Sequence, residues 1–587
     1  MQKEKKITGY PSVDRPWLKY YSEEALNVKL PECTIYEYLL EKNNNNPKRP
    51  AINYLGHRIS YSEMFKSIER AANAFSAIGV KSGELVSMCM LTMPETVYSI
   101  YALNKIGAIC NLIEPRTNAE LIKSRINACK SRVLVVVDVF LPKIMEIVEQ
   151  TSLEKIIVVP VSASMPALTT VVFKLTKGRK LSKVPRDPKY QSWSSFIFSG
   201  RKATSIAKKY EKDYPAAIIY TGGTTGISKG AVLSNDCFTA MAAEAYYDAP
   251  TLFTGRRFLE IMPPFIAYGL IFGHFIPFCA GLENCLIPVF VPEKFADYVL
   301  KYKPNHVIGV PTFFESLANN KKIRKERLNF LTSCITGGDK MLVATERHIN
   351  AIYKDRGCQN PLMKGYGMTE MGSAATFTVS QECNIEGSVG IPSQYNNVKV
   401  INSETGEELK YNQHGELCIT GPTMMLGYYN NEKETANVMR KHRDGQTWIH
   451  TGDIGYITED GIIYIVDRIK RMIIRPDGHN VWPSLIENVI AKHVAVSDCA
   501  VVGLPNNEYE NGKIPTAFIV LKEGFTPSDE LVLEIEDLSK KHLPERDIAM
   551  AYRFCDNLPL TLLGKVDYRY LEKHHSDDSK RDRKSHK

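Results

Sequence analysis

The chain alternates short apolar runs with amphipathic stretches over much of its length. Between Glu84 and Val161, β-rich runs such as RVLVVVDVF and KIIVVPV are separated by helical stretches such as PETVYSIYALNKIG. Strands that alternate with helices in this way predict βαβ units around a parallel sheet. The alternation resumes after Ala216 and continues to about Tyr366. The pattern therefore predicts two stacked α/β units.

The pattern changes after Ser388. From there to Ile465, strand-like runs are separated by turn signals without a long helix, which predicts a β-barrel or a small antiparallel sheet. Past Lys470 a shorter α+β section follows, with helices expected at SLIENVIAKH and DELVLEIEDLSKKHL. The terminal stretch KHHSDDSKRDRKSHK is poor in apolar residues, and we expect it to be a disordered tail.

Length and composition narrow the class of protein. The 587 residues are 44% hydrophobic and 24% charged, which is typical of a globular chain and excludes a fibrous or mainly disordered one. Thirteen cysteines are scattered without a CxxC pair, so neither a disulfide framework nor a zinc site is expected. The N-terminus lacks the apolar segment of a secretory signal. Both observations fit a reducing cytoplasm.

One apolar run meets the length test for a membrane span. The run from Phe265 to Leu282 contains only His274 as an ionisable group. Three glycines and the central Pro277 interrupt it, which favours a buried helix.

Positive charge is concentrated between Lys174 and Lys212, where twelve basic residues face only Asp187 and Glu211. One interpretation is a solvated surface insertion. The other is attraction to an anionic membrane surface, helped by the apolar run MPALTTVVF just before it. No basic pattern interleaved with aromatic residues is found, so a nucleic-acid partner is not expected.

The clearest chemical motif is YTGGTTGISKG, at residues 220–230, directly after a strand-like run. Its glycines allow a tight turn that brings N–H groups close to an anion, and its hydroxyls and lysine add donors and charge. It is not a Walker loop, which requires glycine before the lysine and Ser or Thr after it. We expect a phosphate cradle, formed by Thr221, Gly222, Gly223, Thr224, Thr225, Gly226 and Lys229.

With this motif the sequence resembles the adenylate-forming superfamily of acyl-CoA synthetases, adenylation enzymes and luciferases, and is most similar to the long-chain fatty acyl-CoA synthetases. The family signature YGxTE stands here at 366–370, within GYGMTE. The resemblance implies that Glu370 and Thr221 hold Mg²⁺ and that Thr369 contacts the α-phosphate. A carboxylate is a suitable ligand for this hard cation. The nucleotide site would also include Gly365, Tyr366 and Gly367.

Three further segments match the family in order. In WIHTGDIGY the resemblance implies that Asp453 accepts hydrogen bonds from the ribose hydroxyls. In DRIK it implies that Arg468 also reaches the ribose and that Lys470 is the hinge between a large and a small domain. The string ITGGD resembles the adenine-contacting loop, with Gly338 and Asp339 at the contact positions.

The segment LPLTLLGKVDYRYL resembles the family motif whose lysine, here Lys565, is carried into the active site by the small domain. Acyl-adenylate formation brings a carboxylate toward an anionic α-phosphate. A cation between them stabilises that encounter. The resemblance therefore implies that Lys565 is catalytic, together with Glu370 and Thr221.

Departures from the family pattern concern the choice of substrate. In MPPFIAYGL an aliphatic Ile266 stands where many relatives have histidine, so we expect an apolar acyl pocket at Phe265, Ile266 and Tyr268. In RPDGHNVWPSLIE, Gly478 is kept and is expected on the thiol-acceptor side. Leu485 replaces an expected glutamate, which weakens the inference that coenzyme A is the acceptor.

We therefore expect an ATP-dependent acid–thiol ligase that uses ATP, Mg²⁺ and coenzyme A. It would activate a carboxylic acid, favoured to be fatty or otherwise hydrophobic, as acyl-adenylate, and then transfer it to coenzyme A with release of AMP. One alternative is an enzyme that loads an acyl or peptidyl carrier protein. A more remote one is a non-catalytic nucleotide- or acyl-binding protein.

The expected architecture is α/β, with a large N-terminal domain of two stacked α/β subdomains plus a β-barrel, and a small mobile α+β C-terminal domain. The expected boundaries are 1–469 for the adenylation domain, 470–572 for the mobile domain and 573–587 for the tail. The expected location is the cytoplasm, with peripheral contact at the inner membrane surface left open.

Overall fold

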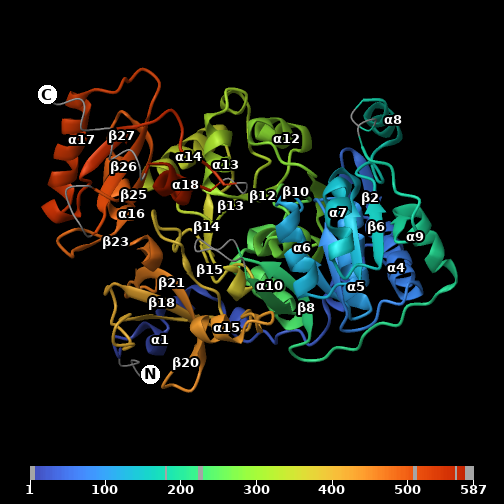
Figure 1. The fold of residues 1–587 in the computed structure, drawn as a ribbon. Coiled ribbons are helices and arrows are strands. Elements are labelled where there is room, and N and C mark those ends of the chain that lie inside the picture. Colours follow the sequence, from blue (N-terminus) through green and yellow to red (C-terminus); the bar gives the residue numbers. More distant parts are fainter. Residues whose placement is uncertain are drawn as a thin grey trace.

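The computed structural model describes residues 7–176, 178, 181–221, 229–506, 512–561 and 565–575. Two large sheets build the N-terminal part, with helices around them (Figure 1). The first has the order β19-β9-β8-β4-β3-β5-β6-β7. Its strands are β3 (Leu85–Cys89), β4 (Ile109–Leu112), β5 (Val133–Val137), β6 (Lys155–Val159), β7 (Tyr190–Ser192), β8 (Pro215–Tyr220), β9 (Gly230–Ser234) and β19 (Gly427–Tyr428).

The second sheet has the order β16-β15-β14-β13-β12-β10-β11-β1-β2. Its strands are β1 (Pro50–Tyr54), β2 (His57–Ser60), β10 (Arg257–Glu260), β11 (Glu283–Leu286), β12 (His306–Gly309), β13 (Ser333–Thr336), β14 (Met363–Tyr366), β15 (Thr376–Phe377) and β16 (Ile391–Pro392). One hydrophobic core runs through both sheets, so the two predicted α/β units share a single interior.

The helices between the strands begin where the sequence caps them. Ser60 and Glu63 form a capping box at the start of α4 (Tyr61–Ala77), and α5 (Pro94–Lys105) begins at a proline. The other helices between first-sheet strands are α6 (Ala119–Ala128), α7 (Leu141–Ile147), α8 (Ala167–Leu175) and α9 (Trp193–Ser199), and α10 (Asn235–Asp248) leads from β9 to the second sheet. The second sheet is flanked by α3 (Ile35–Asn43), α12 (Phe295–Tyr302), α13 (Pro311–Asn319) and α14 (Val343–Arg356).

For the segment between 388 and 465 two forms were expected, a β-barrel or a small antiparallel sheet, and the structure has the second. The order is β17-β18-β21-β20, and β22 also pairs with β21. The strands are β17 (Asn397–Ile401), β18 (Gly415–Thr420), β20 (Met439–Lys441), β21 (Thr447–Ile457) and β22 (Ile463–Arg468). Its interior is a separate apolar cluster.

The C-terminal region forms a small α+β unit at the upper left of Figure 1, with its own core. Its elements are β23 (Ile473–Ile474), β24 (Asn480–Val481), α16 (Pro483–Ile490), β25 (Val496–Leu504), β26 (Ile514–Leu521), α17 (Asp529–His542), β27 (Ala551–Phe554) and α18 (Tyr568–His575). Helix α18 extends three residues into the range expected to be tail, and residues 576–587 lie outside the described part of the chain.

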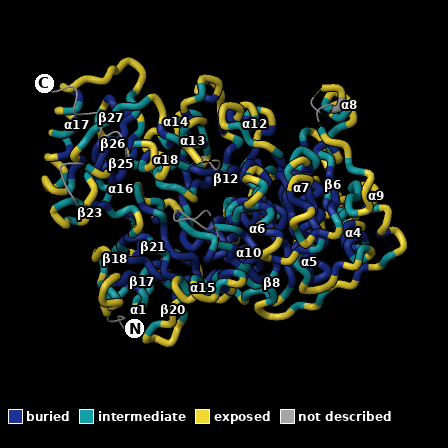
Figure 2. Tube along the Cα trace, in the orientation of Figure 1, coloured by how far each residue is buried: buried dark blue, intermediate teal, exposed yellow. Residues whose placement is uncertain are grey.

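The apolar run from Phe265 to Leu282 is mostly buried, as expected, and Figure 2 shows that buried residues fill the interior of the N-terminal part. It is not one helix, because a π-helix from Tyr268 to Gly273 is followed by the short helix α11 (Ile276–Cys279). Proline at the start of α11 cannot continue a preceding helix. Among the described residues, no helix combines the length and the apolar character needed to cross a bilayer.

Candidate active site

The expected phosphate cradle connects β8 to β9. These strands pair antiparallel, and the Thr221 N–H donates to the Lys229 carbonyl oxygen across the neck of the connection, with an N···O distance of 2.9 Å. The residues between them, including Gly222, Gly223, Thr224, Thr225 and Gly226, lie outside the described part of the chain. Thr221 and Lys229 therefore mark the two ends of the cradle.

Lys229 and Glu370 are linked through Tyr428. The Lys229 ammonium forms an ion pair with Glu434 of α15 (Glu432–Val438) and lies 5.0 Å from the centre of the Tyr428 ring. The Tyr428 hydroxyl donates to Glu370 Oε1. The predicted phosphate ligand and the predicted metal ligand are thus joined in one contact chain.

The oxygen donors of Glu370 and Thr221 suit Mg²⁺. Glu370 is buried, with 8% of its surface exposed, and the Met425 N–H donates to its carbonyl oxygen. Its carboxylate and the Thr221 hydroxyl offer only oxygen atoms, which Mg²⁺ prefers over nitrogen or sulfur. Glu370 and Thr221 therefore fit Mg²⁺, the cation that the family resemblance implies.

The GYGMTE segment leaves β14 and turns tightly. Gly365 and Tyr366 pair with β15, and a Cβ at Gly367 would lie 1.8 Å from the Ser373 carbonyl oxygen. Only glycine fits at 367. Thr369 then begins a single 3₁₀ turn that also contains Glu370.

Asp453 and Arg468 face each other across the ladder between β21 and β22. Arg468 Nε lies 3.0 Å from Asp453 Oδ1, and the Tyr366 hydroxyl donates to Asp453 Oδ2 at 2.5 Å. Burial raises the pKa of Asp453, while Arg468 and Tyr366 oppose that rise. The structure thus brings the TGD, DRIK and GYGMTE segments together around one carboxylate.

The ITGGD loop follows β13. Gly338 has a left-handed φ of +81°, and the Lys340 N–H donates to Asp339 Oδ1 at 2.9 Å. Burial raises the pKa of Asp339. Asp339 also lines a small cavity of about 50 Å³ whose other walls include Glu487 and Tyr568 of the C-terminal unit. The adenine loop expected from sequence therefore lies at the junction of the two domains.

Lys565 reaches this junction from the C-terminal unit. Its ammonium interacts electrostatically with Asp339, Asp453 and Arg468. Burial lowers the pKa of Lys565, the two carboxylates raise it, and Arg468 lowers it further. The Thr561 N–H donates to the Lys565 carbonyl oxygen at 2.7 Å. The structure thus brings Lys565 to the side of the N-terminal part that carries Asp339, Asp453 and Arg468.

Two predicted residues lie at the edge of this arrangement. Lys470 is in the 3₁₀ turn Ile469–Arg471 that directly follows β22, where the chain leaves the N-terminal part. Gly478 occupies an exposed turn between β23 and β24, with a φ of +79°. The position of Lys470 suits a hinge, and Gly478 lies on the surface of the small domain.

The expected acyl-pocket residues lie beside the nucleotide segments. Phe265 is buried, and Ile266 and Tyr268 are half-buried. The Tyr268 hydroxyl donates to the carbonyl oxygen of Ile335, on the strand that leads into Gly338. The π-helix is therefore fixed against the strand that carries the adenine loop.

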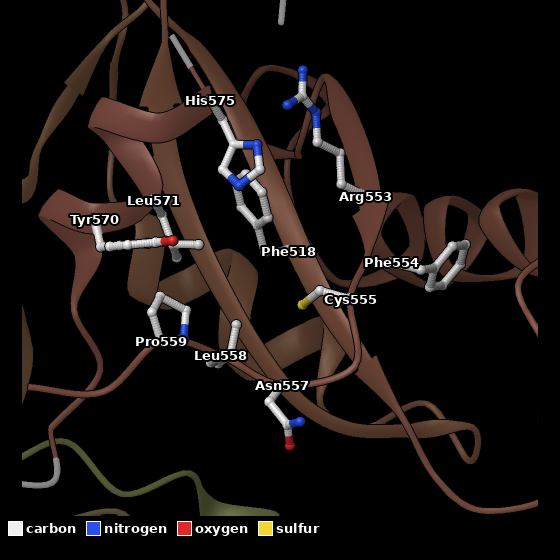
Figure 3. A pocket seen from close by; sticks show the side chains of 10 residues that line it. All are labelled: Phe518, Arg553, Phe554, Cys555, Asn557, Leu558, Pro559, Tyr570, Leu571 and His575. Atoms are coloured by element: carbon white, nitrogen blue, oxygen red, sulfur yellow. The ribbon is translucent and has the colours of Figure 1, made fainter.

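A second cavity, of about 710 Å³, lies in the C-terminal unit (Figure 3). Its lining includes Phe518, Arg553, Leu558, Tyr570 and His575, and the ring centres of Phe518 and His575 lie 4.8 Å apart. None of the predicted site residues lines it. We therefore separate it from the candidate active site.

Sequence reasoning missed the residues that hold the site in place. Glu487 of α16 pairs with Lys340 (2.7 Å) and with Arg471 (2.6 Å), and Arg471 lies 3.8 Å from the Tyr568 ring centre. These contacts join residues far apart in sequence. Sequence spacing cannot reveal such contacts.

Comparison with known proteins identifies the family. The family model described as AMP-binding enzyme matches residues 39–429, which is more than half of the chain. This chain belongs to the AMP-binding enzyme family. The model for the AMP-binding enzyme C-terminal domain matches residues 485–565 of this AMP-binding enzyme, so the resemblance inferred from motifs is confirmed.

Relatives of this AMP-binding enzyme are similar over nearly their full length. It is 27% identical to a long-chain-fatty-acid–CoA ligase of Bacillus subtilis over 96% of this chain and 99% of the relative. It is 28% identical to a probable 4-coumarate–CoA ligase of Dictyostelium discoideum, over 88% and 91%.

Among solved structures, an ATP-bound RpMatB-BxBclM chimera superposes on this AMP-binding enzyme with a TM-score of 0.79 at 26% identity, covering 93% of this chain and 99% of that one. ATP-bound MatB of Rhodopseudomonas palustris gives 0.78 at 24%, with the same coverage. The expected fold class, a large α/β N-terminal domain with a small C-terminal domain, is confirmed.

Proposed function

We propose that the protein is an ATP-dependent acid–thiol ligase that works in two half-reactions. In the first, a carboxylate oxygen of the acid attacks the α-phosphorus of ATP, and the bond to pyrophosphate breaks. In the second, a thiol attacks the acyl carbonyl carbon and AMP leaves. The thioester and AMP are then released from the same site.

Named residues have distinct tasks in the first half-reaction. The cradle between Thr221 and Lys229 binds phosphates, and Asp453 with Arg468 binds the ribose. Mg²⁺ bound at Glu370 and Thr221 would supply positive charge beside the phosphates. Lys565 stabilises the negative charge that gathers as two anions meet. The remaining nucleotide contacts are assigned to Gly338, Asp339, Gly365, Tyr366, Gly367 and Thr369.

The observation that carries this proposal is the position of Lys565. A half-buried lysine from the small domain interacts with Asp453 and Arg468 of the large one. A cation brought to the ribose-side pair is what joining an acid to AMP requires. Rotation about Lys470 would then remove Lys565 and present another face, including Gly478, to the thiol.

Isotope exchange between labelled pyrophosphate and ATP, run with a panel of acids and Mg²⁺, tests the first half-reaction. Lys565→Ala should slow acid-dependent exchange by about 100-fold or more. The same variant should still consume preformed acyl-adenylate when coenzyme A is added. Exchange that is absent with every acid, or unchanged in Lys565→Ala, would overturn the assignment.

For the acid we propose a fatty or other hydrophobic substrate. Support comes from Ile266 in the predicted acyl pocket and from similarity over nearly full length to a protein named long-chain-fatty-acid–CoA ligase. The rate of AMP release should increase with the chain length of the acid. A preference for short or polar acids would contradict this choice.

Coenzyme A is the proposed acceptor of the acyl group. Because Leu485 departs from the family pattern, one alternative acceptor is tested beside it, the phosphopantetheine thiol of a carrier protein. Mass spectrometry of the products separates the two. An acyl-CoA product supports the proposal. Acyl transfer to a carrier protein alone, with none to free coenzyme A, supports the alternative.

We also propose that the protein docks on anionic membrane surfaces through α8. This helix stands clear of the body of the molecule (Figures 1 and 2). Its outer side chains are aliphatic and more than half exposed, and basic residues follow it in the chain, including the exposed Lys183 and Arg186. The aliphatic residues are Leu168, Val171, Val172 and Leu175.

Vesicle sedimentation tests this docking. Binding should be stronger with phosphatidylserine-containing vesicles than with phosphatidylcholine alone, and should weaken as salt is raised. Leu168→Asn should reduce binding, whereas Leu533→Asn, at an equally aliphatic exposed position on α17, should not. Equal binding by both variants would refute a role for α8.

A further inference from the structure

Three potential metal ligands converge on the antiparallel sheet, away from the residues assigned above. They are Cys418 on β18, His450 on β21 and His442 just after β20. The cysteine sulfur and one nitrogen of each ring all lie within 4.8 Å of one another. The scattered cysteines gave no sign of this in the sequence, because the cluster joins β18, β21 and the residue that follows β20.

The backbone pairing explains why they meet. Cys418 and His450 are direct partners across the ladder between β18 and β21, so their side chains share one face. The His442 N–H donates to the Gln446 carbonyl oxygen at 2.9 Å, which closes the hairpin between β20 and β21. His442 Nε2 lies 2.9 Å from His450 Nε2. The cluster is therefore held by regular sheet rather than by a loose loop.

A carboxylate orients one of the histidines. His450 Nδ1 lies 3.0 Å from Glu416 Oε2, and a carboxylate can only accept, so Nδ1 carries the proton and Nε2 keeps its lone pair. The other oxygen, Glu416 Oε1, accepts from the Gly452 N–H at 3.1 Å. A histidine whose second nitrogen donates to a carboxylate is the usual support for a metal ligand.

We propose that Cys418, His442 and His450 form a binding site for one borderline divalent metal ion of the Zn²⁺ class. Bond lengths of about 2.3 Å to sulfur and about 2.0 Å to nitrogen put tetrahedral ligand atoms roughly 3.3–3.6 Å apart, so side-chain shifts of about 1 Å or less complete the site. The Cys418 thiol loses its proton to solvent when the metal binds.

The surroundings of the cluster suit such an ion. Cys418 and His450 are buried, whereas His442 is half-buried and leaves the fourth position open to water. Lys399, the cross-strand partner of Cys418 on β17, is paired with Asp444 at 2.8 Å and lies over the Trp448 ring. Its charge is therefore already offset by a carboxylate.

Metal binding would connect β18 and the end of β20 to β21, the strand that carries Asp453. His450 is on the same strand as Asp453, and Glu416 binds both His450 and the Gly452 backbone. We therefore assign the site a stabilising role for β21. This inference does not rest on the proposed ligase reaction.

Cobalt substitution of the full-length protein tests the site. The purified protein is stripped with a chelator, loaded with Co²⁺ and freed of excess ion by gel filtration. We expect one tightly held Co²⁺ per chain, a thiolate-to-metal band in the near ultraviolet, intense tetrahedral visible bands, and loss of all three when Zn²⁺ is added.

Cys418→Ser should abolish the near-ultraviolet band, and His442→Gln, which keeps the thiol, should lower retention of the metal. Cys358→Ser, at a half-buried cysteine elsewhere, should behave like the unmodified protein. Circular dichroism checks that each variant is folded. If Cys418→Ser does not fold, metal retention by His442→Gln tests the site. The proposal is overturned if the protein retains no metal or if His442→Gln leaves the spectrum unchanged. His442, His450 and Glu416 would then be linked by hydrogen bonds only.

Discussion

Asp453 is a buried carboxylate with both oxygens oriented by neighbours. Arg468 and Tyr366 contact different oxygens, and each oxygen keeps a further lone pair for a ribose hydroxyl. The TGD and DRIK motifs predicted Asp453 and Arg468 from sequence. The Tyr366 contact could not be predicted, because 87 residues separate the partners and only the fold brings them together.

Asp453→Asn should raise the KM for ATP by about 10- to 100-fold, since hydrogen bonds to a charged group contribute about 1.5–3 kcal/mol each. Pyrophosphate exchange measured across a range of ATP concentrations checks this. Asp460→Asn, at an exposed residue that pairs with Lys19, is the matched control. An unchanged KM in Asp453→Asn would remove the ribose role from this residue.

Glu487 makes stability depend on pH. Burial by itself would raise the pKa of Glu487, but Arg471 and Lys340 outweigh it and lower the pKa to about 2. A folded-state pKa below the unfolded value gives stability that is complete above about pH 4.5 and is lost as the pH falls toward 2.

The urea midpoint should therefore fall more steeply for the unmodified protein than for Glu487→Gln between about pH 5 and pH 3. Removing one partner of a buried ion pair should also destabilise the variant near neutral pH by about 3 kcal/mol. Equal slopes for the two proteins in acid would show that Glu487 is not the titrating group.

At the scale of elements, local pattern predicted most strands and helices of the βαβ region. β5 is the run VLVVV, buried at all five positions, which is typical of a central parallel strand. Two features escaped prediction. The first is that β9 pairs antiparallel with β8 after the cradle. The second is that β1 and β2 join the second sheet beside β11, although β1 precedes β11 by more than 200 residues in the chain. Sheet partners are chosen by long-range packing, which periodicity does not reveal.

The π-helix is the element most sensitive to added volume. A Cβ at Gly273 would lie 1.7 Å from Glu260 Oε2, so Gly273→Ala should lower the melting temperature by several degrees. Gly445→Ala is the control, because its Cβ meets nothing within 4 Å and only its left-handed φ costs about 1 kcal/mol. Thermal unfolding of both variants checks this, and equal shifts would contradict close packing at Gly273.

At the scale of the whole molecule, the two domains meet through charged contacts. Lys340 of the large domain pairs with Glu487 of the small one, beside the cavity that Asp339 lines. This contact holds the two domains in the arrangement in which Lys565 interacts with Asp339. Sequence motifs predicted both halves of the site but not the contact that holds them together.

Lys340→Met should slow pyrophosphate exchange by about 3- to 10-fold, since a partly exposed ion pair contributes about 1 kcal/mol. Transfer from preformed acyl-adenylate to coenzyme A should not slow, because that step uses the other domain arrangement. Lys322→Met, which breaks an exposed pair with Asp297, is the control. Equal slowing of both half-reactions would indicate a general folding defect instead.

The sequence by itself determined the family and the division into a large and a small domain, and it supplied the proposed polar residues of the chemistry, because these depend on local spacing and residue type. The tertiary structure decided which residues support them. Tyr366 reaches Asp453, Tyr428 joins Lys229 to Glu370, and Cys418 meets two histidines across strands. Such contacts depend on sheet register and domain position, which arise from burial of the whole chain.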